Sequence, residues 1–124
     1  MATSYKVNGI RIGDAVFESV KLESAGAGVF PVGAVLAIDS TSGNFVRFNP
    51  AGADGAEIAK AVLTAEVEFT GAGVKSERVA ISGKFRVNDL VDSTGTALTP
   101  LAIEQLRDYT ILALKTSELS YADN

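Results

Sequence analysis

The chain has 124 residues, of which 47% are hydrophobic and 7% aromatic, and its formal net charge at pH 7 is −4. A chain of this length usually forms one domain with its own core, here built mainly from aliphatic side chains that suit β structure. Because cysteine, histidine and tryptophan are absent, the composition excludes disulfides, thiolate nucleophiles and imidazole groups for metal binding or acid–base catalysis.

The charge and hydropathy patterns also limit the partners. The 11 basic residues are dispersed, whereas nucleic-acid binding depends on concentrated positive charge, so we expect no direct nucleic-acid contact. The longest uncharged run, residues 24–38, is shorter than the roughly 18 apolar residues that suggest a membrane span. We therefore expect no membrane contact, and an N-terminus without an apolar stretch gives no argument for secretion.

Residues 1–24 differ from the rest of the chain. Short apolar patterns spaced by two surround the glycines in this segment, at Tyr5, Val7, Ile10 and Ile12. Two interpretations are open. The segment is either the first hairpin of the domain, or an extended arm that completes a sheet of another molecule, because an isolated strand leaves its backbone groups unpaired.

The next stretch begins with small residues and leads into two apolar strands. Residues 24–33 predict a hinge or linker, with Phe30 and Pro31 packing where the domain begins. The run 35–38 predicts a strand buried on both faces, followed by a turn at 39–44 and a partner strand over 45–48.

The middle of the chain holds two alternating segments, 63–69 and 78–87. Their period of two predicts a hairpin of half-buried strands with a long connection over 70–77. In such a hairpin the outward Glu66 and Glu68 would face the basic residues of the second strand, each pair contributing roughly 0.2 to 1 kcal/mol.

After Val87 the pattern is irregular over residues 88–98. Thr99 and Pro100 then suit the N-cap and first position of a short helix ending near Tyr109, with apolar positions at 101, 103 and 106. Residues 111–114 predict a last strand, and residues 115–124 a polar tail.

No set of residues has the spacing of a catalytic, cofactor or metal site. Asp39, Thr41 and Gly43 open like a calcium loop, but Pro50 stands where the bidentate glutamate belongs. Glu66, Glu68 and Glu77 could be proposed as the paired carboxylates of a hydrolase. However, the alternating pattern puts Glu66 and Glu68 on a solvent-exposed strand face, and Glu77 follows a loop. The sequence therefore predicts a binding or structural protein with no cofactor, and a small hydrolase using these glutamates is the enzymatic alternative.

Several segments, in order, resemble the head decoration proteins of tailed bacteriophages. They are VLAID at 35–39, FVRF at 45–48, ADGA at 53–56 leading to AVL at 61–63, SGKFR at 82–86 and DL at 89–90. The similarity covers about residues 33–90 and is weaker over 101–114.

The resemblance implies a mainly β, β-rich α+β domain: a small mixed β barrel, or tulip-like fold, with one or two short helices and an extended N-terminal arm. It implies a homotrimer at three-fold sites on the outer surface of the expanded capsid, made in the host cytoplasm, which binds the major capsid protein and resists internal DNA pressure. The arm would add a strand to a capsid-protein sheet through Tyr5, Val7, Ile10 and Ile12.

The expected organisation is an arm or first hairpin at 1–24, a β-rich decoration-type domain at 25–114 and a tail at 115–124. Trimer contacts are expected at Phe30, Pro31, Leu90 and Val91, within and beside the loop 88–98. Two other interpretations remain open. One is another phage structural β module, such as a tail-tube or head-completion subunit. The other is a surface-displayed carbohydrate-binding module, although this chain has no tryptophan, the commonest residue on which sugars stack.

Overall fold

The computed structural model describes residues 15–109 and 111–114. The strands are β1 (Val16–Ser24), β2 (Gly28–Phe30), β3 (Val35–Ile38), β4 (Phe45–Arg47), β5 (Ala61–Val62), β6 (Val67–Phe69), β7 (Gly73–Arg86) and β8 (Ile111–Leu114). A 3₁₀ turn follows β7 at Val87–Asp89, and the helix α1 spans Pro100–Asp108.

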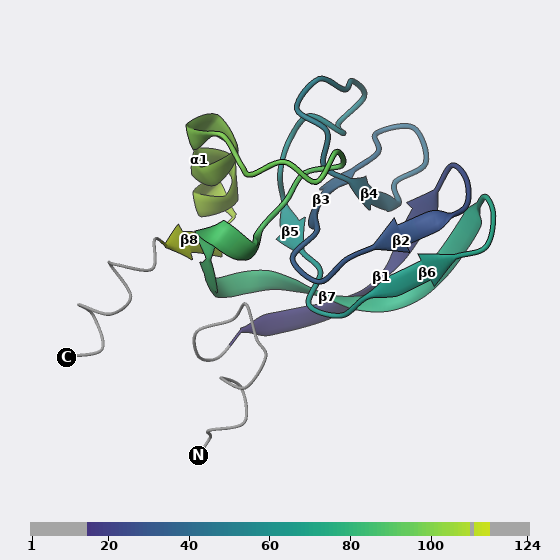
Figure 1. The fold of residues 1–124 in the computed structure, drawn as a ribbon, viewed down its shortest axis with the longest axis horizontal. Helices are drawn as coiled ribbons and strands as arrows, with labels where there is room; N and C mark the ends of the chain where they lie inside the picture. The colour runs from purple at the N-terminus through teal and green to yellow at the C-terminus, as the bar shows by residue number, and fades with distance from the viewer. Residues whose placement is uncertain (1–14, 110, 115–124) are drawn as a thin grey trace, which may run out of the picture.

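The strands β1, β4, β3, β5 and β7 form a closed five-stranded barrel, because β1 also pairs with β7 (Figure 1). The longest pairing is antiparallel and runs from Val16 opposite Ser82 to Ser24 opposite Gly73. The prediction of a small β-rich barrel with a short helix is confirmed.

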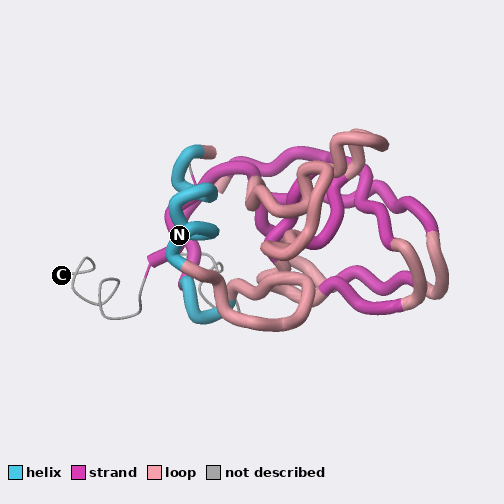
Figure 2. Tube along the Cα trace, turned by 90° about the horizontal axis from the view of Figure 1, so that it is seen from above, coloured by secondary structure: helices cyan, strands magenta, loops and turns pink. Residues whose placement is uncertain are grey.

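Two additions flank the barrel. The strands β2 and β6 form a separate two-stranded ribbon, and β8 extends the sheet by pairing in parallel with the last residues of β7. Seen from above, α1 lies at one end of the molecule and long strands with their connecting loops reach the other (Figure 2). The helix and these connecting loops therefore lie at opposite ends of the molecule (Figure 2).

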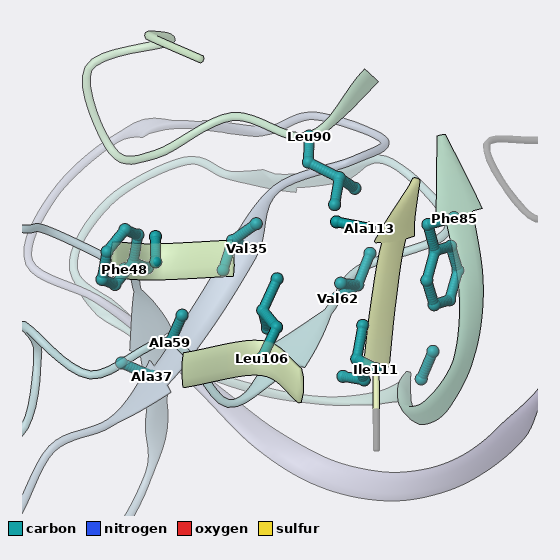
Figure 3. Packing of buried hydrophobic residues seen from close by; sticks show 12 residues of the cluster. Val35, Ala37, Phe48, Ala59, Val62, Phe85, Leu90, Leu106, Ile111 and Ala113 are labelled. Atoms are coloured by element: carbon teal, nitrogen blue, oxygen red, sulfur yellow. The ribbon is translucent and has the colours of Figure 1, made fainter. Parts of the chain in front are cut away.

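Alternate residues of the barrel strands face two separate cores. Val35 packs in an α1-side core with Leu106 of α1 and Ile111 of β8 (Figure 3). Leu36, the next residue, packs in a ribbon-side core with Phe69 of β6. This alternation explains why β3 is buried on both faces, as the apolar run at 35–38 predicts.

The predicted hairpin between residues 63–69 and 78–87 is wrong. The strand β6 pairs with β2, and β7 already begins at Gly73 and pairs with β1. The prediction of a linker at 24–33 is also wrong, because this stretch contains the strand β2. The pairing of β2 with β6 places the Phe30 and Phe69 rings 5.0 Å apart, and this aromatic contact favours it over the sequence-adjacent hairpin.

The predicted charge pairs between the two alternating segments are wrong for the same reason. Glu68 lies opposite Val29, and Arg78 lies opposite Ser19 with its guanidinium over the Phe17 ring. The alternation within β7 is also interrupted, because Gly83 has φ +142. Val79 and Ile81, before this glycine, consequently pack in or against the ribbon-side core, whereas Phe85, at the next alternate position after it, packs in the α1-side core.

The local predictions around the remaining elements are confirmed with one exception. The antiparallel pair β3–β4 and the strand β8 are present. The Thr99 side chain accepts a hydrogen bond from the Ala102 amide, with Pro100 beginning α1. Leu106 is buried in the α1-side core and Ile103 packs against it, as predicted. Leu101, however, is 68% exposed, and Ala102 is buried in its place.

Candidate functional site

The structure brings together the two segments in which trimer contacts are predicted. The Val91 amide donates to the Gly33 carbonyl at 3.0 Å, and the Val35 amide donates to the Val91 carbonyl at 3.0 Å. Val91 is also bridged to Ala97 in antiparallel orientation. We call residues 31–35 together with 89–97 the junction.

The predicted contact residues have different exposures within the single chain. Phe30 and Leu90 are 5% and 0% exposed and belong to the two cores, whereas Pro31 and Val91 are partly exposed. The sequence analysis missed Val32, which is 41% exposed between Pro31 and Gly33. The exposure of Val32 results from how distant parts of the chain pack, so no local sequence pattern marks it. The prediction that these residues contact other subunits stays a prediction.

A glycine permits the close approach within the junction. Gly33 has φ +92, and a Cβ built there would lie 2.0 Å from the Asp89 carbonyl oxygen. Other residues rarely adopt this backbone conformation, so both the positive φ and the contact favour glycine. The packing of residues 31–35 against 89–91 therefore depends on this position.

Asp92 organises the turn that follows. Its Oδ1 atom accepts hydrogen bonds from the Thr94 amide at 2.8 Å, the Thr94 hydroxyl at 2.7 Å and the Thr96 amide at 3.1 Å. Burial raises the pKa of the Asp92 carboxyl, but these hydrogen bonds and nearby Arg47 outweigh it, so the pKa lies below its ordinary value.

Arg47 of β4 reaches this turn from the barrel. Its Nη2 atom donates to the Asp92 carbonyl oxygen at 2.5 Å, and its guanidinium carbon lies 5.6 Å from the centre of the Phe30 ring. Among the described residues, its Nε is the one buried side-chain nitrogen or oxygen atom without a hydrogen-bond partner. Burial lowers the pKa of the Arg47 guanidinium and Asp92 opposes this, yet the group stays charged at neutral pH.

The four predicted arm residues, Tyr5, Val7, Ile10 and Ile12, lie outside the described residues, as does the segment 115–124. Residues 16–24 of the first segment form β1 and pair with β7. Ala15, the first described residue, lies beside Gly83, because a Cβ atom built at Gly83 would be 2.8 Å from the Ala15 Cβ atom. Gly83 also pairs with Ile111, the first residue of β8. The described chain thus begins and ends at the same end of the barrel (Figure 1).

The residues weighed for other chemistry do not form a common site. Glu66 and Glu68 are exposed on and beside β6, and Glu77 lies on β7 opposite Val20. The Asp39 carboxylate accepts from the Thr41 amide within its own turn at 2.8 Å. Across residues 15–109 and 111–114, no group of three or more acidic, histidine or cysteine side chains is arranged to hold a metal ion, and none of the described helices has the length and apolarity to span a bilayer.

Comparison with known proteins identifies a family. The model of a family described as "Bacteriophage lambda head decoration protein D" matches residues 15–111, which include every strand of the barrel, the ribbon and α1. No curated protein and no solved structure matches the chain.

Proposed function

Because the chain belongs to the family of the bacteriophage lambda head decoration protein D, and is thus a structural protein of a phage capsid, we propose that it cements the expanded head. In this proposal it binds as a homotrimer at three-fold sites on the outer surface, contacts the major capsid protein and stabilises the shell against internal DNA pressure. It acts by binding, not by catalysis. The observation that carries the proposal is the family match over the whole barrel.

The junction supports the subunit contacts of this trimer. Val32 is 41% exposed beside the partly exposed Pro31 and Val91, and the backbone beneath them is held by hydrogen bonds at both ends. An apolar surface on a rigid support loses little conformational freedom on association. Repetition around a symmetric shell would further strengthen a modest affinity at each site.

The N-terminal arm is proposed to add a strand to a capsid-protein sheet. The chain joins the barrel at Ala15, beside Gly83, so residues 1–14 precede an already complete barrel. Strand addition would pair their backbone groups with the acceptor, with Tyr5 and Val7 spaced by two before Gly9 and Ile10 and Ile12 spaced by two after it.

Cementing is tested by heating expanded heads assembled with and without the protein. We expect decorated heads to survive a higher temperature and a higher chelator concentration. Equal resistance of the two kinds of particle would contradict the cementing role.

The arm is tested by deleting residues 2–14 and by the substitutions Ile10→Pro and Ile10→Thr. Proline removes a backbone donor and disfavours strand pairing, whereas threonine keeps β propensity. We expect the deletion and Ile10→Pro to keep the native far-ultraviolet circular dichroism but reduce occupancy of expanded heads. Unchanged occupancy after the deletion would show that the arm is not used.

The subunit contact is tested by Val32→Gln, with Val29→Gln as the matched control. Val29 is 46% exposed on β2, close to the 41% of Val32, but it lies on the ribbon opposite Glu68. Only Val32→Gln should raise the protein concentration needed for half-occupancy of the heads. If both variants occupy heads like the wild type, the junction is not a subunit contact.

The family match favours head decoration over the tail-tube, head-completion and carbohydrate-binding alternatives. The hydrolase alternative predicts that Glu66→Gln with Glu68→Gln abolishes an activity. We expect this double variant to decorate heads like the wild type, because both side chains are exposed and the proposal gives neither a chemical role.

A further inference from the structure

We propose that Arg47 is a positioning residue that holds the junction in the shape a second copy of the chain recognises. The inference rests on the proposed trimer. It adds that one residue, Arg47, determines the shape of the surface through which the subunits contact each other. Arg47 itself does not form that surface, because it lies beneath the turn 92–97 and acts through the residues above it.

The contacts of Arg47 join three separate parts of the fold. Its backbone belongs to β4, opposite Leu36 of β3. Its guanidinium lies over the Phe30 ring of β2 at 5.6 Å and donates to the Asp92 carbonyl oxygen at 2.5 Å. A planar guanidinium can stack on a ring and donate in its own plane at the same time, which a lysine ammonium cannot do.

The turn above Arg47 is anchored at its two ends and exposed between them. Val91 before it is hydrogen-bonded to Gly33 and Val35, and Leu98 after it packs against the α1-side core. From Ser93 to Ala97 no side chain is buried, so these residues gain no anchor from the core. Its internal hydrogen bonds run between Asp92 and residues 94–96 and define its shape without attaching it to the barrel. Between Val91 and Leu98, attachment to the barrel comes from the Ser93 amide, which donates to the Phe48 carbonyl at 2.8 Å, and from Arg47.

Ala97 depends on this attachment. It is bridged to Val91 across the turn, and Val91 is bridged to Ala34, two residues after Val32. A turn that shifts on the barrel would move Ala97 relative to Val32 and change the surface that they present together. Loss of Arg47 should therefore weaken assembly more than it weakens the fold.

The test compares Arg47→Met with the matched control Arg78→Met. Each substitution removes one positive charge and one arginine–phenylalanine contact, since the Arg78 guanidinium lies 4.7 Å from the centre of the Phe17 ring. Arg78 belongs to β7 opposite Ser19 of β1 and is part of neither junction segment. The readout is the concentration of folded protein that gives half-occupancy of expanded heads, measured well below the unfolding temperature.

We expect Arg47→Met to raise this concentration at least tenfold and Arg78→Met to change it less than twofold. Faster hydrogen exchange at the Ala97 and Thr96 amides of Arg47→Met, with unchanged exchange in β3, would show that the turn has moved. Arg47→Lys, which keeps the charge, should also be weakened, and it serves as the test if Arg47→Met does not fold.

The outcomes separate the two proposals. If wild-type protein decorates heads and a folded Arg47 variant decorates them equally well, the positioning role is overturned and the cementing function stands. If Arg78→Met is weakened as much as Arg47→Met, loss of charge explains the effect and the positioning role is again overturned. Wild-type protein that fails to bind heads would overturn the cementing function and this inference with it.

Discussion

Substitution of Gly33 by alanine should destabilise the fold far more than the same change at another glycine of positive φ. At Gly33 an alanine Cβ would lie 2.0 Å from the Asp89 carbonyl oxygen, whereas Cβ atoms essentially never approach another atom within 3.0 Å. The two backbone segments must therefore move apart by at least 1 Å. Gly43 provides the control, because it has φ +77 and nothing within 4 Å of its Cβ position.

The two effects can be estimated separately. Forcing an alanine into the left-handed region costs about 1 to 2 kcal/mol, and Gly43→Ala should lose this amount. At Gly33 the displacement also breaks or weakens the hydrogen bond from the Val91 amide to the Gly33 carbonyl, and a buried group left unpaired costs about 1 to 3 kcal/mol. We expect a total of about 3 to 5 kcal/mol for Gly33→Ala, from these two contributions and residual strain.

Urea unfolding followed by far-ultraviolet circular dichroism measures both variants. The free energy of unfolding should fall while its dependence on urea stays unchanged, because the barrel still unfolds as one unit. The measurement is repeated at several protein concentrations, since association shifts the apparent stability. If Gly33→Ala loses no more stability than Gly43→Ala, the two junction segments do not approach each other closely at Gly33.

Three further predictions concern the core, a cap and a titrating group. Leu106→Ala should cost about 2 to 5 kcal/mol because Leu106 is fully buried in the α1-side core, whereas Leu101→Ala, at an exposed position, should change the free energy of unfolding by less than about 0.5 kcal/mol. Thr99→Ala should cost about 1 kcal/mol through loss of the N-cap, and Thr99→Ser should restore most of it. The pKa of Asp92 is lowered in the folded protein, so its carboxylate stabilises the fold above its unfolded pKa, about 3.9, and this contribution is lost as the pH falls through the folded value. Asp92→Asn should therefore be less stable than the wild type at pH 7, and urea unfolding at successive pH values should show the difference shrinking below about pH 4.

The parts of the fold with local signals could be predicted from the sequence. A threonine before a proline marks the start of α1, and the turn residues between 38 and 45 mark the β3–β4 hairpin. In each case the residues that interact are close in the chain. The resemblance of ordered segments to head decoration proteins adds the family, which the match over residues 15–111 confirms.

The parts that depend on distant pairings could not be predicted. Alternation in residues 63–69 indicates a strand but does not identify its partner, and β2 pairs with β6 because the Phe30 and Phe69 rings meet. Arg47 and Asp92 are 45 positions apart, and neither has a sequence pattern that marks the other. The exposure of Val32 likewise follows only once the junction has formed.

Cryo-electron microscopy of expanded and unexpanded heads, each incubated with the purified protein, tests the central claim most directly. We expect trimeric density at three-fold sites on the outside of expanded heads alone, with the junctions of neighbouring subunits facing one another. We also expect residues 1–14 to continue from Ala15 as a strand on a capsid-protein sheet. Absence of density on expanded heads, or density at sites without three-fold symmetry, would refute the decoration role.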